Sequence, residues 1–173
     1  MTTRPAASEY APFYAGYVRR VPETDVLAAL ERQPDELAAV AARIPEGREH
    51  HRYAADKWSV REVFGHLVDA ERVFGYRAFC FGRRDTTELP GFPENEFVAR
   101  SRFSELRLAR HAEEFALVRR GHLAMLRQID AAGWEHVGSA NGSPVSTRAL
   151  AYMMVGHVRH HLAVLAERYG VEV

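Results

Sequence analysis

The sequence predicts an all-α protein, a single four-helix bundle, and three observations support this prediction. Four segments carry apolar residues at the spacing of an amphipathic helix. Three of these segments begin at a serine that is placed to cap a helix. We find no strand pair with hairpin chemistry, no internal repeat and no low-complexity segment. The 173 residues, 47% of them apolar, suffice for one domain with a real core, covering residues 1–173.

The first helix is expected at residues 24–43, where apolar residues recur at helical spacing. Pro34 interrupts this pattern and is expected to kink the helix or restart it locally. The residues before it, 1–23, contain three prolines and scattered aromatic residues, which predict an irregular lead-in. The segment Ile-Pro-Glu-Gly that follows Arg43 ends the helix.

The second helix has the clearest start signal in the chain. Ser59 and Glu62 form the S-x-x-E pattern of a capping box, and the helix is expected to run to about Arg83. The connection that follows, 84–103, is longer than a tight helix–helix turn needs, which suggests a crossover or a functional loop. It contains two prolines and a glycine, and we expect one short helical turn at 94–100.

The last two helices are also delimited by capping residues. Ser104 is expected to cap the third helix, which extends to about Ala131 and is ended by Gly133. The linker after it contains the turn pair Asn141-Gly142. The fourth helix is expected to begin at the cap Ser146 and to reach Tyr169 before Gly170 stops it.

Charge and cysteine content exclude several classes of function. The 23 basic residues balance the 23 acidic residues, so the chain lacks the long-range attraction that nucleic-acid and anionic-membrane binders use. The single cysteine can form neither an internal disulfide nor a four-cysteine zinc site. No signal peptide or membrane span is apparent. We therefore expect a cytoplasmic protein with no nucleic-acid or membrane partner.

Three histidines are predicted to face the core at the same depth of the bundle. His157 and His161 lie four residues apart, on the apolar face of the fourth helix. His66 lies on the apolar face of the second helix. If these two helices are antiparallel, His66 and His161 each lie ~10 Å from the same end of the bundle. The cluster is then either a three-histidine metal site or a set of hydrogen-bonded core histidines, and the spacing alone does not decide between them.

Three blocks of the sequence resemble the DinB/YfiT superfamily of four-helix-bundle proteins. The blocks are WSVREVFGHLVDAERVF, LPGFPENEF and SANGSPVSTRALAYMMVGHVRHHLAVL, and the resemblance covers residues 24–169. It implies an up-down-down-up bundle in which the 84–103 connection returns the chain to the same end. It also implies that His66, His157 and His161 hold a divalent metal ion. Imidazole ligands suit both zinc and nickel, and the spacing does not choose between them.

The resemblance implies a metal-dependent enzyme of thiol S-transferase or hydrolase type. Three neutral imidazoles leave coordination positions open, and the metal would acidify a bound water or deprotonate a bound low-molecular-weight thiol. No catalytic residue can be assigned. The alternative is a non-catalytic bundle stapled by its metal, acting in a stress response or in partner binding. DNA binding is a third hypothesis, and the zero net charge argues against it.

The resemblance also places other residues. Together with aromatic residues near the N-terminus it implies a homodimer, whose contacts we expect from Tyr10, Phe13, Tyr14 and Tyr17. Two segments are expected at the mouth of the site and supply candidate contacts to a small-molecule substrate: His50, His51, Tyr53, Phe92, Glu94, Asn95 and Glu96. The 139–144 turn is expected at the opposite end of the bundle, with a capping role.

The remaining polar residues near the site have simpler expected roles. Asp69 is expected to be solvated, although it could orient a ligand from outside the metal's coordination sphere. Glu71 is expected to form a structural ion pair with an arginine. His160 is expected to be exposed and His122 to belong to the core. Cys80 is too far along its helix to join the cluster and is expected to be a small buried residue.

Overall fold

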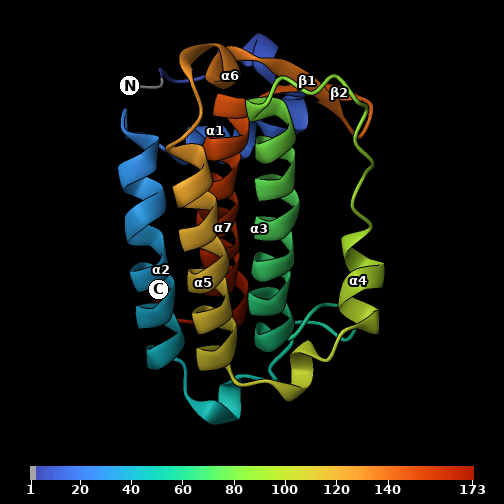
Figure 1. Cartoon of the computed structure of the whole chain (residues 1–173). Helices are drawn as coiled ribbons and strands as arrows, with labels where there is room; N and C mark the ends of the chain where they lie inside the picture. The colour runs from blue at the N-terminus through green and yellow to red at the C-terminus, as the bar shows by residue number, and fades with distance from the viewer. Residues whose placement is uncertain (1–2) are drawn as a thin grey trace.

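Four long helices form a bundle in the computed structural model, which describes residues 3–173 (Figure 1). They are α2 (Val26–Arg43), α3 (Val60–Gly82), α5 (Leu108–Leu126) and α7 (Thr147–Tyr169). Figure 1 shows that α3 and α5 run in one direction and α2 and α7 in the other. Helices α3 and α7 pack against each other and are antiparallel, as the common depth of the histidines requires. Within residues 3–173, no helix is both long enough and apolar enough to cross a membrane.

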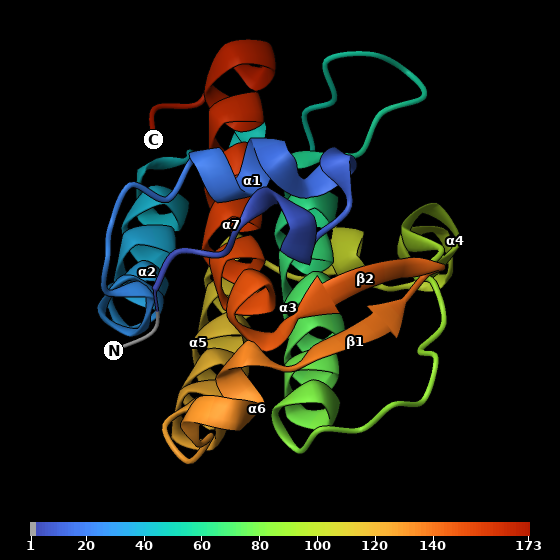
Figure 2. The same ribbon diagram turned by 90° about the horizontal axis from the view of Figure 1, so that it is seen from above.

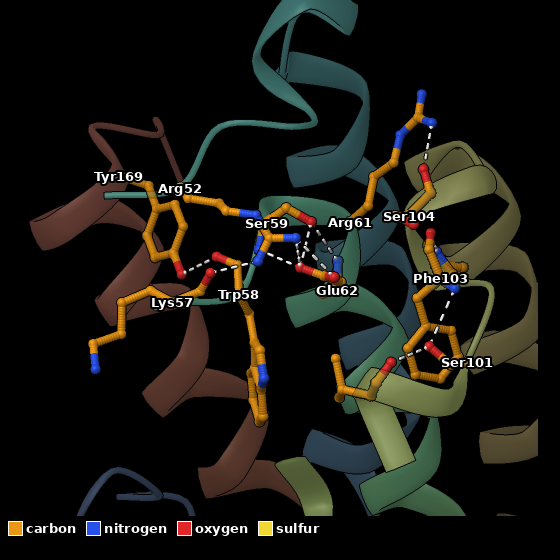
Figure 3. A network of polar contacts seen from close by, with 12 residues as sticks. Arg52, Lys57, Trp58, Ser59, Arg61, Glu62, Ser101, Phe103, Ser104 and Tyr169 are labelled. Atoms are coloured by element: carbon orange, nitrogen blue, oxygen red, sulfur yellow. Dashed lines mark hydrogen bonds and ion pairs between the residues drawn. The ribbon is translucent and has the colours of Figure 1, made fainter. Parts of the chain in front are cut away.

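The predicted starts of three of these helices are confirmed by their caps or by their bounds. Ser59 and Glu62 form the predicted capping box of α3: the Ser59 hydroxyl accepts from the Glu62 N–H, and the Glu62 carboxylate accepts from the Ser59 N–H at 2.6 Å (Figure 3). Ser146 caps α7 by accepting from the Ala149 N–H. Helix α2 begins after Asp25 and continues through Pro34 to Arg43. At the far end of α7, Gly170 adopts the left-handed conformation that ends a helix, with φ 63°.

The predicted start and end of the third helix are wrong. Ser104 lies in a 3-10 turn (Phe103–Glu105), and the next two residues are extended, so α5 begins only at Leu108. Helix α5 ends at Leu126, and a separate short helix, α6 (Ala131–Glu135), follows it. The Asp130 carboxylate accepts from the N–H of Gly133 at 2.7 Å, so it caps this new helix, and Gly133 lies inside a helix instead of ending one.

A small β-hairpin contradicts the all-α expectation. Strands β1 (Val137–Ala140) and β2 (Ser143–Ser146) pair antiparallel. Asn141 and Gly142 connect them with φ values of 54° and 70°, and two consecutive positive φ values are typical of the tightest hairpin turns. The backbone of Leu89 also bonds to this hairpin, through Ser139 and Asn141 at 3.0 and 2.9 Å. The hairpin reaches past α3 toward the short helix α4 (Glu94–Arg100), which was expected at these residues (Figure 2).

The lead-in is more ordered than the sequence predicts. It contains 3-10 turns at Ala7–Glu9 and Pro12–Tyr14 and a short helix α1 (Ala15–Arg19), which lies across α7 (Figure 2). A Cβ at Gly156 of α7 would lie 2.1 Å from the Tyr17 carbonyl oxygen. Helix α1 can therefore approach α7 this closely only because residue 156 is glycine.

A buried polar network joins the four long helices. The guanidinium of Arg119 (α5) is fully buried and donates to both carboxylate oxygens of Glu71 (α3) at 2.7 and 2.8 Å. It also donates to the side-chain oxygen of Gln33 (α2) at 2.9 Å, and Gln33 donates to the Val155 carbonyl (α7) at 2.9 Å. The predicted structural ion pair of Glu71 is thus confirmed. His122 bonds to Glu71 at 2.9 Å and is partly exposed, so it is not the core residue that was expected.

Candidate metal centre

Three histidine side chains converge where α3 and α7 face each other. The Nε2 atom of His157 lies 3.1 Å from the Nε2 atom of His66 and 3.1 Å from that of His161. One ring nitrogen from each of the three residues falls within 4.8 Å of the others. The direction and depth inferred for these side chains from the sequence are therefore realised in the structure.

Burial keeps the three imidazoles neutral at neutral pH. Burial lowers the pKa of His66 to about 4. It also lowers the pKa values of His157 and His161 well below the usual range, and the neighbouring imidazoles lower them further. A neutral imidazole that keeps its proton on Nδ1 offers a lone pair at Nε2. Three imidazole nitrogens within 4.8 Å of one another are a donor set that zinc or nickel takes in proteins, so the cluster fits a divalent metal ion.

Aromatic side chains enclose the cluster on several sides. The ring of Trp58 lies 4.7 Å from that of His66, and Phe92 stacks parallel to His66 at 6.2 Å. On the α7 side, Tyr17 meets the ring of His157 edge-on at 5.4 Å. This apolar surrounding is what removes the imidazoles from water and favours their neutral forms.

The segment that carries Trp58 is fixed by side chains that donate hydrogen bonds to its backbone carbonyls. The Tyr169 hydroxyl donates to the Trp58 carbonyl at 2.7 Å, and Arg52 donates to the Lys57 carbonyl at 2.5 Å (Figure 3). Arg52 also bonds to Glu62 of the capping box at 2.9 Å. The start of α3 and the end of α7 are therefore held together beside the histidines.

A cavity of about 560 Å³ opens from the histidine cluster. Its walls also include Arg77 on α3 and residues from three further parts of the chain, represented by Tyr17 near the N-terminus, Glu94 in the long connection, and Asn141 in the hairpin. A second cavity of about 690 Å³, lined by Tyr53, adjoins it and shares His161 with it. The histidines thus border space in which a small molecule can bind.

Only some of the residues predicted at the mouth of the site line one of the two cavities. Phe92 and Glu94 line the histidine cavity. Tyr53 and Asn95 line the neighbouring cavity, which shares His161. The remaining three, all within the described part of the chain, line neither cavity: His50, His51 and Glu96.

Other expectations need correction. His160 is only partly exposed: its ring lies 5.3 Å from that of Tyr17, and it lines both cavities. The 139–144 turn also lines the histidine cavity, through residues of the hairpin, so its role is not limited to capping. The hairpin brings it there because its strands cross α3 near Phe81, at the C-terminal end of that helix (Figure 2).

The aromatic residues expected to contact a partner differ in exposure. Phe13 is exposed, and the other three pack against the rest of the chain but are only half-buried: Tyr10, Tyr14 and Tyr17.

Asp69 is less solvated than expected: its side chain is 22% exposed, burial raises its pKa, and it pairs with Arg72 at 3.4 Å. Cys80 is buried within the apolar core, as expected. The sequence analysis did not single out Arg77 or Trp58 as residues of the site. Both have a weak signal in the sequence that could have found them. Trp58 directly precedes the capping box of the helix that carries His66, and Arg77 lies on the same face of that helix as His66, eleven residues further on.

Comparisons with known proteins agree with this architecture. The family model of the DinB superfamily matches residues 29–165. The structure is similar to YfiT from Bacillus subtilis, which is described as a probable metal-dependent hydrolase with an unusual four-helix bundle topology. The TM-score is 0.73 at 18% sequence identity, and the match covers 88% of this chain and 91% of the other. At this identity the similarity establishes the shared fold. No curated protein matches the sequence.

Proposed function

The chain belongs to the DinB superfamily, and we propose that it is a divalent-metal-dependent enzyme of hydrolase or thiol S-transferase type. His66, His157 and His161 would hold the metal ion, zinc or nickel. One observation carries this proposal: three neutral imidazoles in the wall of a cavity bring their ring nitrogens within 4.8 Å of one another. The description of the structurally similar YfiT as a probable metal-dependent hydrolase supports the same class of function.

The bound metal would supply a Lewis acid that activates water or a low-molecular-weight thiol at neutral pH. The chain itself supplies a binding space from which aromatic side chains exclude much of the water. Because the three imidazoles carry no charge, the full positive charge of the ion would act on the ligand in this space. A thiol would have to come from outside, since Cys80, the one cysteine, is buried elsewhere in the core.

Two groups in the cavity are placed to handle protons. Glu94 is the only carboxylate among the residues that line the histidine cavity. Burial, the neighbouring Tyr14 and the charge of Glu94 raise the pKa of Tyr17, so Tyr17 stays a neutral phenol that can donate a hydrogen bond. We propose that Glu94 accepts a proton from the nucleophile and that Tyr17 orients the substrate.

The cavity favours an enzyme over a bundle that is merely stapled by its metal. A structural zinc site is closed by four protein ligands, whereas this cluster contains three among the described residues. All three histidines line the cavity, which leaves room for a ligand from outside the chain. The alternative is a bundle whose metal only stabilises the fold and which acts in a stress response or in partner binding. We would adopt this alternative only if no metal-dependent reaction is found.

An activity assay on matched variants tests the proposal. The protein is stripped with a chelator, reloaded with zinc or nickel, and assayed with activated esters and amides and with an electrophile plus small thiols. We expect turnover that requires metal, is lost in His157→Ala and is retained in His50→Ala, because His50 is exposed and lies outside both cavities. Equal turnover in verified metal-free protein would contradict the proposal, as would metal binding that stabilises the fold without any turnover.

Homodimerisation is a second proposal, supported by one exposed side chain. Phe13 is 75% exposed, although its neighbours Tyr14 and Tyr17 pack against the rest of the chain. Burying Phe13 against a second copy would remove this apolar surface from water. Sedimentation equilibrium should show a dimer that Phe13→Ser weakens, and a wild-type monomer at all concentrations would contradict the proposal.

A further inference from the structure

The guanidinium of Arg77 is a charged group in the histidine cavity that the proposed chemistry does not use. Arg77 follows His66 by eleven residues on α3, so the two side chains share one face of the helix and lie about 16 Å apart along its axis. Helical side chains lean toward the N-terminus of their helix, which directs the long Arg77 side chain toward the histidines. Residues 70, 73 and 74 line the cavity between them.

Arg77 is buried without a carboxylate partner. The residue is 6% exposed, and its one hydrogen bond within residues 3–173 goes from Nη2 to the Pro90 carbonyl at 2.8 Å. The other two deeply buried arginines differ: Arg61 donates to Glu49 at 2.7 Å, and Arg119 donates to both carboxylate oxygens of its partner. Arg77 lies in the wall of the cavity, and its other N–H groups can donate to a bound acceptor.

The residues around Arg77 form one end of the histidine cavity, and this end is suited to a ligand. The bond to Pro90 holds the connecting segment beside the hairpin, because the preceding residue, Leu89, is paired with the hairpin backbone. Ser143 supplies a hydroxyl at this end of the cavity, and Tyr14 and Phe74 supply apolar walls. A ligand can therefore meet a cation, a hydroxyl and aromatic rings together.

The charge balance of the cavity favours an anionic ligand. Arg77 is the only arginine or lysine among its lining residues, and Glu94 is the only carboxylate. A divalent ion at the neutral histidines adds positive charge that no other group in the wall offsets. We propose that Arg77 forms an anion-binding subsite that selects substrates with a carboxylate group. The planar guanidinium matches a carboxylate through two parallel hydrogen bonds.

This inference rests on the proposed function in calling the bound anion a substrate. Binding of the anion at Arg77 does not itself require the metal. The test therefore measures affinity. Benzoate and its neutral isostere benzamide are titrated into the full chain by NMR, once with a chelator and once with zinc. In the metal-free protein we expect benzoate to bind at least about tenfold more tightly than benzamide, with shifts at Arg77 and Phe74.

Three variants assign that preference. Arg77→Gln should bind the two probes equally, and Arg77→Lys should keep part of the preference because it retains the charge. Arg83→Gln, which removes the exposed arginine directly after the same helix, should behave as the wild type. Thermal melts of all variants report folding, and Arg77→Lys keeps the test decisive if Arg77→Gln unfolds.

The outcomes separate the subsite from the metal chemistry. The proposal of an anion subsite is contradicted if the metal-free wild type does not bind benzoate more tightly than benzamide. It is also contradicted if Arg77→Gln, or a folded Arg77→Lys, keeps the full preference for benzoate. A preference for benzoate that appears only with zinc and survives in Arg77→Gln would show that the carboxylate binds the metal, which also contradicts the proposed subsite at Arg77. Failure of the metal-dependent activity, with the Arg77-dependent preference intact, would overturn the proposed function alone.

Discussion

Two buried polar clusters lie close together in the bundle, and they differ in how their hydrogen bonds are used. In the network around Arg119, the guanidinium donates to Glu71, Gln33 and a backbone carbonyl, and these partners come from helices α2 and α3. In the histidine cluster the ring nitrogens contact only one another, and Nδ1 of His66 has no partner among the described residues. The first cluster is saturated by the protein, and the second is not.

This difference separates a structural cluster from a ligand site. A buried ion pair whose remaining donors and acceptors are satisfied can contribute to a unique packing arrangement, but it offers nothing to a ligand. A cluster of neutral imidazoles whose ring nitrogens lie close together leaves its bonding capacity to a group that is not part of the chain. The unused donors of Arg77 in the same cavity follow the second pattern.

The largest expected effect is on the saturated network. Arg119→Met leaves the fully buried Glu71 without its cation and should lower the free energy of unfolding by about 3–5 kcal/mol. Arg120→Met removes the exposed neighbouring arginine and should change it little. Urea denaturation of both variants measures the contrast. Equal effects would show that the network does not hold the four helices together.

The next effect concerns the unsaturated cluster and requires metal. Zinc at about 100 times its dissociation constant should stabilise the wild type by about 2.7 kcal/mol, or about 5–10 °C in Tm for a chain of this size. His157→Ala should abolish this shift, and His50→Ala should keep it. Differential scanning calorimetry with and without zinc measures it. A shift that survives in His157→Ala would place the metal elsewhere in the molecule.

Acidification should weaken the saturated network. Burial alone would raise the pKa of Glu71, but the charge of Arg119 and the hydrogen bonds from His122 and Arg119 outweigh burial and lower the pKa. A carboxyl with a lowered folded pKa stabilises the fold fully above its unfolded pKa, about 4.3, and the contribution is lost as the pH falls. The difference in unfolding free energy between wild type and Glu71→Gln should therefore narrow below about pH 4. A constant difference from pH 7 to 3 would contradict this account.

The smallest effect comes from an ion pair near the surface. The hydrogen bond from Arg159, together with the charges around it, lowers the pKa of Glu23 to about 2, and the two side chains are 27% and 23% exposed. Glu23→Gln should cost less than about 1 kcal/mol, and raised salt should reduce the cost further. Denaturation at two salt concentrations checks this. If Glu23→Gln lowered the free energy of unfolding as much as Arg119→Met does, the size of these effects would depend on ion pairing and not on burial.

The long helices and the histidine cluster could be predicted because their signals are local. A capping box begins α3 at Val60, and the periodic spacing of apolar residues shows that His66, His157 and His161 face the core. An antiparallel pairing then places them at one depth with no further information. The family resemblance pointed to the same three residues.

The hairpin and the polar partners could not be predicted in this way. Each strand has four residues, and in β1 only Val137 is of a type that favours strands, so the strands gave no signal beyond the Asn141-Gly142 turn. All but one of the 23 basic residues are arginine, so composition does not distinguish the buried Arg77 and Arg119 from those at the surface. Their partners come from other helices or from a connecting segment, and only the folded chain brings them together.

The position of a bound metal ion tests the central claim most directly. A crystal grown with zinc and measured at the zinc absorption edge should show one anomalous peak, about 2.0–2.1 Å from Nε2 of His66, His157 and His161, with a remaining position facing the cavity. No peak at the cluster, or a peak closed by a fourth protein ligand, would contradict the account of an open three-histidine site.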